Sequence, residues 1–168
     1  LAPSNIQEAV DFTQEAFDIA DQYRSPVIVL VDGLIGQMME PIVWHEVPRR
    51  KLPDKSGWAA AGKRGRDRTH IITSLFIDPN DCEQLNFRLE EKYREIRKNE
   101  VRWEEQDCGD AEVVLVSYGT PARISLSALE LLRERGVRAG LFRPVTLWPY
   151  PEEALRALAS RPQVKALL

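Results

Sequence analysis

The most regular hydrophobic pattern in the chain lies between Asp110 and Tyr150. Val113 to Val116 is an apolar run of strand length, rich in β-branched residues, which is typical of a strand covered on both faces of a parallel sheet. Apolar residues then recur at helical spacing until Gly136, which ends the predicted helix. A second apolar run extends from Val137 to Phe142. The pattern predicts one β-α-β unit, with the right-handed crossover that such units adopt.

The loop from Tyr118 to Arg123 follows the carboxyl end of the first predicted strand, where open α/β sheets place ligand or partner sites. Thr120 is predicted to cap the helix, because Pro121 then occupies the first helical position, where a missing N–H costs nothing. The sequence therefore offers an interface or ligand loop, and no residue is predicted to be catalytic or to bind a cofactor or metal. Its candidate residues are Tyr118, Gly119, Thr120, Arg123, Arg143 and Trp148.

Three of these candidates have alternative interpretations. Arg123 and Arg143 are interpreted first as members of a structural ion pair or of a subunit contact. Trp148 lies between a leucine and a proline, and both an interface anchor and a core position fit it.

The first 44 residues carry a second α/β pattern. Ser4 and Gln7 fit a capping box, and the helix that follows is predicted to end near Tyr23. Val27 to Val31 is predicted to be a buried strand, so that helix and strand form one step of another parallel sheet. The predicted inner stripe of the helix is Ile6, Val10, Thr13, Phe17 and Ala20, and Met38 and Met39 are interpreted as core filling or as an adaptable contact surface.

Residues 45–109 read as a linker followed by a long charged helix. The linker is rich in proline, glycine and basic residues, which is typical of a solvated connection and also fits a site for a phosphate group or an acidic partner. Asp78 and Pro79 predict the start of the helix, which ends around Asn99 to Trp103 and is followed by a polar hinge at residues 106–110. One narrow seam is expected to pack on a neighbouring domain or subunit: Cys82, Leu85, Leu89, Tyr93 and Ile96.

The last residues predict a short helix from Glu152 to Ser160 and a strand from Val164 to Leu168. Because Leu1 is not a start methionine and the final strand is short, the chain is interpreted as part of a longer protein.

Composition narrows the class of protein. Apolar residues make up 43% of the 168 residues, which predicts a folded core, and the net charge of −3 argues against nucleic acid as the main partner. The two cysteines predict neither a disulfide framework nor a metal site, so a cytoplasmic location is expected. No apolar run reaches the length of a membrane span. No motif for a nucleophile, a metal or a dinucleotide is present.

Two strings resemble a known family. Val-Ser-Tyr-Gly-Thr-Pro-Ala-Arg (116–123) and Leu-Phe-Arg-Pro-Val-Thr-Leu-Trp-Pro-Tyr-Pro (141–151) resemble the transketolase C-terminal-like domain of 2-oxoacid:ferredoxin oxidoreductase alpha subunits. Leu1 to Ser4 and Asp32 to Pro41 resemble the end of the pyrimidine-binding domain of the same subunits. The implied organisation is the end of the pyrimidine-binding domain at 1–44, the basic linker and helix at 45–109, and a truncated transketolase C-terminal-like domain at 110–168.

The resemblance implies a role in oxidative decarboxylation of a 2-oxoacid to an acyl-CoA, with electrons passed to ferredoxin. The implied complex uses thiamine diphosphate, Mg²⁺, iron–sulfur clusters and coenzyme A, while this chain binds none of them and is inactive alone. Implied partners are a beta subunit that carries thiamine diphosphate, gamma and delta subunits, and ferredoxin. Two alternatives stay open: the beta subunit of a thiamine-dependent 2-oxoacid dehydrogenase or a transketolase-type enzyme, and a non-enzymatic binding module that uses the 118–123 loop.

Overall fold

The computed structural model describes residues 1–47, 50–63, 65 and 67–168. Pro48, Arg49, Arg64 and Arg66, which contribute to the proline content and basic character of the predicted linker, lie outside the described residues. Four α-helices are described, α1 (Ile6–Tyr23), α2 (Pro79–Asn99), α3 (Gly119–Glu134) and α4 (Glu152–Ala159), with a short 3-10 helix η1 (Ile35–Gln37). The described strands are β1 (Trp103–Gln106), β2 (Val113–Val116), β3 (Ala139–Pro144) and β4 (Ala166–Leu167).

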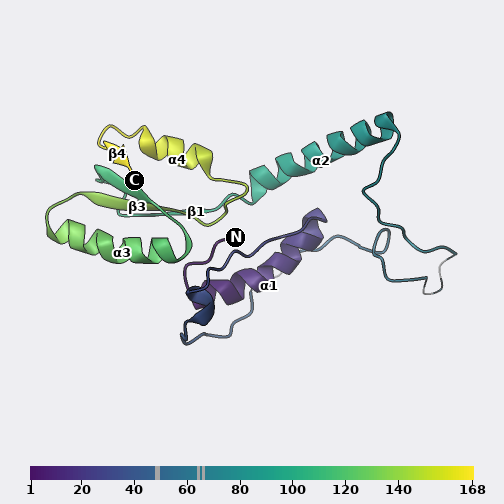
Figure 1. Ribbon diagram of the computed structural model, residues 1–168, viewed down its shortest axis with the longest axis horizontal. Coiled ribbons are helices and arrows are strands. Elements are labelled where there is room, and N and C mark those ends of the chain that lie inside the picture. Colours follow the sequence, from purple (N-terminus) through teal and green to yellow (C-terminus); the bar gives the residue numbers. More distant parts are fainter. Residues whose placement is uncertain (48–49, 64, 66) are drawn as a thin grey trace.

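The strands form one sheet in the order β1-β3-β2-β4, with α3 and α4 on opposite faces (Figure 1). β2 pairs in parallel with both β3 and β4, which confirms the predicted β-α-β unit and the predicted last strand. β1 pairs antiparallel with β3, and the sequence predicted no strand there. All four β1 residues are exposed, so this edge strand has no apolar alternation to reveal it.

The core of the sheet follows the alternation of side chains along β2 and β3. Val114 and Phe142 pack with Leu158 of α4 in one cluster. Leu141 packs with Leu129 of α3 in a second cluster, against which Leu115 also packs. Successive residues of a strand point to opposite faces, so each helix covers one face of the same two strands. All six β3 residues are buried, as expected for a central strand between two helical layers.

α1 has the predicted length, but its buried face differs from the predicted stripe. Phe17 was predicted to face inward and is 71% exposed, whereas Ile19 and Tyr23 are buried against Ile96 of α2. The cap is also one residue later than predicted, because the side chain of Asn5 accepts a hydrogen bond from the N–H of Glu8 at 2.8 Å. The end of α2 therefore decides which side of α1 is buried, and no local pattern carries that information.

The predicted buried strand at Val27–Val31 is wrong for this structure. The segment is extended but belongs to no described strand, and Ile28 is 73% exposed. Leu1 lies beside the segment: its amino group donates to the carbonyl oxygen of Ile28, and the N–H of Leu30 donates to the carbonyl oxygen of Leu1, both at 2.8 Å. Core filling is also the wrong interpretation for Met39, whose side chain lies in the η1 loop region and is 99% exposed.

α2 begins as predicted, with Asp78 accepting hydrogen bonds from the N–H groups of Asn80 and Asp81. The helix runs away from the sheet as an arm (Figure 1). Of the predicted seam, Ile96 is buried, while Cys82 and Leu89 remain half-buried. α2 thus packs within the described chain mainly at its carboxyl-terminal end.

Candidate functional site at a junction of three loops

The predicted ligand loop at the end of β2 lies against the loop that follows Val27–Val31. α3 begins at Gly119 after Tyr118, which makes no side-chain cap, so the predicted cap at Thr120 is wrong and Pro121 is the third helical residue. Its missing N–H still costs nothing there, since the first four N–H groups of a helix have no partner within the helix. Gly119 has a φ of +60°, and a Cβ at this position would lie 3.6 Å from the Asp32 carboxylate.

Asp32 is the centre of this junction. One carboxylate oxygen accepts hydrogen bonds from the N–H groups of Leu34 and Ile35, both at 2.9 Å, and the other accepts from the N–H of Thr120 at 3.2 Å. The Thr120 side chain and these N–H groups hold the pKa of Asp32 below its ordinary value. The carboxylate thus supplies the negative charge that the amino end of α3 favours.

Glu40 links the segment after η1 to both α3 and the start of α1. One of its carboxylate oxygens lies 2.5 Å from the guanidinium of Arg123, and the other accepts a hydrogen bond from the N–H of Ile6 at the start of α1. The Arg123 guanidinium holds the pKa of Glu40 below its ordinary value. Arg123 therefore forms an ion pair within the chain.

Arg143 also binds residues of this chain, but from a buried position. Its side chain is 5% exposed, and its two terminal nitrogens donate to both carboxylate oxygens of Glu8, at 2.7 and 2.8 Å. Its Nε donates to Glu104 in β1 at 3.0 Å. The guanidinium thus joins α1, β1 and β3 at one point.

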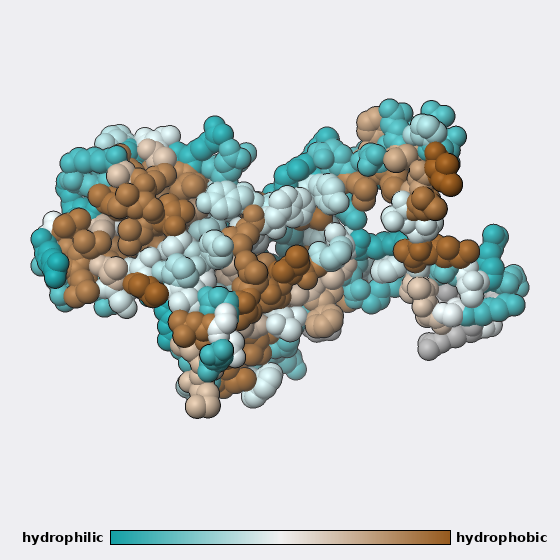
Figure 2. All heavy atoms as spheres, in the orientation of Figure 1, coloured by the Kyte–Doolittle hydropathy of each residue, from teal (hydrophilic) through white to brown (hydrophobic). Residues whose placement is uncertain are grey.

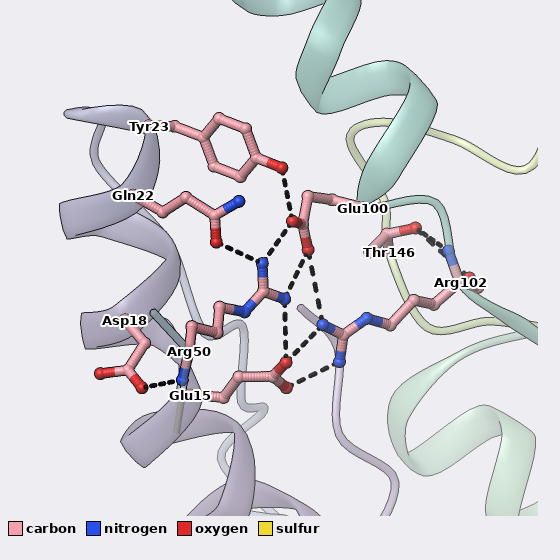
Figure 3. A network of polar contacts seen from close by, with 8 residues as sticks. All are labelled: Glu15, Asp18, Gln22, Tyr23, Arg50, Glu100, Arg102 and Thr146. Carbon is pink, nitrogen blue, oxygen red and sulfur yellow. Dashed lines mark hydrogen bonds and ion pairs between the residues drawn. The ribbon is translucent and has the colours of Figure 1, made fainter. Parts of the chain in front are cut away.

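A second charged network lies where α1, the linker and the end of α2 meet (Figure 3). Both carboxylate oxygens of Glu100 accept hydrogen bonds from Arg50, at 2.5 and 2.8 Å, and one also accepts from the Tyr23 hydroxyl at 2.7 Å. Arg102 donates to both carboxylate oxygens of Glu15, at 2.5 and 2.7 Å. The network ties the linker residue Arg50 to α1, which the sequence did not indicate.

The remaining candidates, Tyr118 and Trp148, are aromatic. Trp148 is 54% exposed and meets the ring of Tyr93 edge-on, with 5.5 Å between ring centroids. Tyr118 is 43% exposed beside the junction. Both aromatic side chains are therefore accessible in this chain.

The junction does not fit a diphosphate group or its metal ion. Asp32 already occupies the amino end of α3, and Glu40 already neutralises Arg123. Within the described ranges, no three His, Cys, Asp or Glu side chains gather where a metal ion could bind. A bound phosphate would have to displace two carboxylates whose charge has the same sign as its own.

The sequence indicated Arg123 and Arg143 as candidates for ion pairs but not which carboxylates they bind. Glu8 and Arg143 are 135 residues apart, and Glu104 lies in the strand that was not predicted. Two signals pointed to Asp32: its position directly after an apolar run, where parallel sheets place functional loops, and the resemblance over Asp32 to Pro41.

We expect Gly119→Ala to lower the free energy of unfolding by about 1–2 kcal/mol, because a left-handed backbone disfavours a Cβ. Urea unfolding of the purified chain measures this loss. Gly109→Ala is the matched control, since nothing lies within 4 Å of a Cβ there and no positive φ is involved. An equal effect of both substitutions would show that the α3 start is not constrained as described.

Comparison with known proteins places these elements in one family. Residues 1–106 match the family model described as pyruvate flavodoxin/ferredoxin oxidoreductase, thiamine diphosphate-binding, and residues 111–167 match the pyruvate:ferredoxin oxidoreductase core domain II. In the part of the chain that the structure describes, no helix is long and apolar enough to cross a membrane.

Individual relatives agree with the family models. A ketoisovalerate oxidoreductase subunit from Methanothermobacter thermautotrophicus is 47% identical over 159 residues, which are 95% of this chain and 45% of that protein. A 2-oxoglutarate synthase subunit from Methanocaldococcus jannaschii is 32% identical and matches 96% of this chain and 50% of its own length. The chain thus spans about half the length of these relatives.

A solved structure shares the fold. The 2-oxoglutarate:ferredoxin oxidoreductase from Magnetococcus marinus, with 2-oxoglutarate, coenzyme A and succinyl-CoA bound, superposes with a TM-score of 0.77 at 20% identity. The match covers 99% of this chain and 33% of that one. Since one family model alone matches 106 of the 168 residues, the chain belongs to the 2-oxoacid:ferredoxin oxidoreductase family.

Proposed function

We propose that this chain is the framework part of an alpha subunit in a 2-oxoacid:ferredoxin oxidoreductase. The observation that carries the proposal is the match of two successive domain models of that enzyme family along nearly the whole chain. The enzyme would convert a 2-oxoacid, with coenzyme A, to an acyl-CoA and carbon dioxide, and pass two electrons to ferredoxin. The ferredoxin-linked family model favours this function over an NAD-linked 2-oxoacid dehydrogenase or a transketolase-type enzyme.

We further propose a branched-chain 2-oxoacid as the substrate. The ketoisovalerate oxidoreductase subunits are 46–47% identical to this chain, whereas the 2-oxoglutarate synthase subunits are 32–33% identical. An enzyme for an apolar substrate gains binding energy from burying its methyl groups, while 2-oxoglutarate requires a partner for a second carboxylate.

The chemistry is assigned to the rest of the complex. Thiamine diphosphate, Mg²⁺ and the iron–sulfur clusters are proposed to lie on a beta subunit and on further gamma or delta subunits in the cytoplasm. Support comes from the junction described above, where Glu40 pairs with Arg123 and Asp32 occupies the amino end of α3, so that the junction leaves no free positive charge for a phosphate-bearing cofactor. In this proposal the chain positions its loops for chemistry on another polypeptide.

The assay is reduction of a viologen dye by the intact complex, purified through a tag on the subunit that contains this chain. We expect coenzyme A-dependent reduction with 3-methyl-2-oxobutanoate, with a kcat/KM at least about 10-fold above that for 2-oxoglutarate. The 168-residue chain alone is expected to show no turnover.

Three results would contradict the proposal in different ways. Reduction of NAD in place of the dye would favour a dehydrogenase, and a preference for 2-oxoglutarate would overturn the substrate alone. Turnover by the isolated chain would overturn the framework role.

A further inference from the structure

A groove of about 680 Å³ lies between the carboxyl-terminal end of α2 and the amino-terminal end of α4. Three accessible aromatic side chains line it, since Trp103 is 43%, Trp148 54% and Tyr150 41% exposed. Figure 2 shows residues of intermediate hydropathy, drawn pale, where the α2 arm meets the body of the protein. Tryptophan and tyrosine are enriched among the residues that dominate binding energy at protein interfaces. The groove therefore has the composition of a contact surface for another polypeptide.

The aromatic side chains of the groove are held in place before any partner binds. Pro149 and Pro151 flank Tyr150 and fix the backbone angle φ on either side of it. The ring of Trp148 rests edge-on against Tyr93 of α2. A surface that is already ordered loses little conformational entropy on binding, so more of its contact energy is available to hold a partner.

The two walls of the groove carry charges of opposite sign. Lys98 lies on the α2 wall and Glu153 on the α4 wall, and both residues are exposed. Among the described residues, no ion pair to either side chain is found. Their neighbours Arg97 and Glu152 differ, because each already pairs with a residue of its own helix. A partner that fits this groove therefore supplies an acid to one wall and a base to the other.

The free edge of the sheet is the other place where a second chain could bind. β1 lies at that edge, and its central residues Glu104 and Glu105 already bind Arg143 and Arg161. Two-fold pairing of β1 with a copy of itself would place acidic side chains opposite one another, which destabilises a strand pair. Charged side chains protect an edge strand from pairing in this way. The groove, by contrast, carries both charges that a copy of itself requires.

We infer that this groove binds the same groove of a second copy of the chain about a two-fold axis. In such a contact, residue i of one protomer meets residue j of its partner, and the reverse holds as well. Lys98 of each protomer then pairs with Glu153 of the other, and the aromatic side chains of both meet between the two ion pairs. A different polypeptide would have to reproduce both charges at the same spacing. The inference does not depend on the proposed enzymatic function.

The test is the mass of the purified chain, measured by sedimentation equilibrium over a range of protein concentrations. We expect a monomer–dimer equilibrium. Lys98→Glu and Glu153→Lys should each raise the dimer Kd at least about 10-fold, because each replaces two attractions per dimer with two repulsions. The matched controls are Arg88→Glu on α2 and Glu130→Lys on α3, which are exposed and lie outside the groove. They should leave the Kd within about 2-fold of its original value.

A double charge swap decides whether the partner is a second copy. Lys98→Glu and Glu153→Lys in one chain restore opposite charges across the two-fold axis, so the Kd should return to within about 3-fold of the original value. Urea midpoints should be equal for all variants, because the changed side chains are exposed. A chain that stays monomeric, a dimer that neither single change weakens, or a double swap as weak as the single changes would each overturn the inference. So would single changes that spare the dimer but release a companion subunit from the intact complex.

Discussion

Arg143→Ala is expected to lower the free energy of unfolding by about 3–5 kcal/mol, the usual cost of removing one partner from a buried ion pair. The guanidinium is 5% exposed and binds both oxygens of Glu8 as well as Glu104. Its removal leaves the Glu8 carboxylate, itself partly buried, without its counter-charge. Urea unfolding at pH 7, followed by circular dichroism, measures the change.

Arg156→Ala is the matched control, because the Arg156 side chain is 77% exposed and pairs with Glu152 one helical turn away in α4. We expect a loss of at most about 0.5 kcal/mol there. Arg143→Lys should lie between the two, since an ammonium keeps the charge but cannot form the two-pronged contact with Glu8. A loss below about 1 kcal/mol for Arg143→Ala would show that the pair does not hold α1 to the sheet.

Glu100→Gln is expected to lower the free energy of unfolding by about 3 kcal/mol at pH 7. Arg50 and Arg102 would then face each other with Glu15 as their remaining carboxylate. Burial would raise the pKa of Glu100, but the hydrogen bonds from Arg50 and Tyr23 outweigh it and hold the pKa below the ordinary value of 4.5. A carboxyl whose pKa is lower in the folded state stabilises the fold above its unfolded pKa. That contribution is lost as the pH falls below about 4.5 toward the folded pKa.

Urea unfolding between pH 7 and pH 3 tests this expectation. The unaltered chain should lose stability below about pH 4.5, and Glu100→Gln should flatten that part of the curve. Glu152→Gln, at a side chain that is 66% exposed, is the control and should leave the curve unchanged. Equal acid sensitivity of all three proteins would show that protonation of Glu100 does not cause the loss of stability.

Local sequence patterns predicted the parts of the fold that depend on near neighbours. The apolar run of β2 and the left-handed Gly136 act within a few residues, and both lie where the pattern put them. Asp78 and Pro79 likewise mark the start of α2. Such features are set by backbone geometry and capping, which depend on the residue types at a few neighbouring positions.

Features that depend on residues far apart in the chain could not be predicted from the sequence. Many carboxylates could have paired with Arg143, and only the fold brings Glu8 and Glu104 to it. The buried face of α1 is set by Ile96, and β1 is held by its pairing with β3. At Val27–Val31 the sequence predicted a buried strand, whereas the segment belongs to no described strand and Ile28 is 73% exposed.

Three contacts support the proposed framework role. Arg143 joins α1 to β1 and β3, Glu100 joins α1 to the linker, and Asp32 joins η1 to α3. The contacts of Arg143 with Glu8 and Glu104, and of Asp32 with Thr120, thus join residues matched by two different family models. The Arg143 contact fixes relative position most strongly, since the guanidinium is 5% exposed and breaking the contact leaves a buried charge uncompensated.

Native-state hydrogen exchange of the chain in low concentrations of urea tests this central claim most directly. If the ion pairs make one body of the two matched regions, the slowest amides of α1 and of β3 should exchange with the same free energy and the same dependence on urea. If α1 opens at a free energy several kcal/mol lower than β3, the two regions are independent and the chain is not a rigid framework.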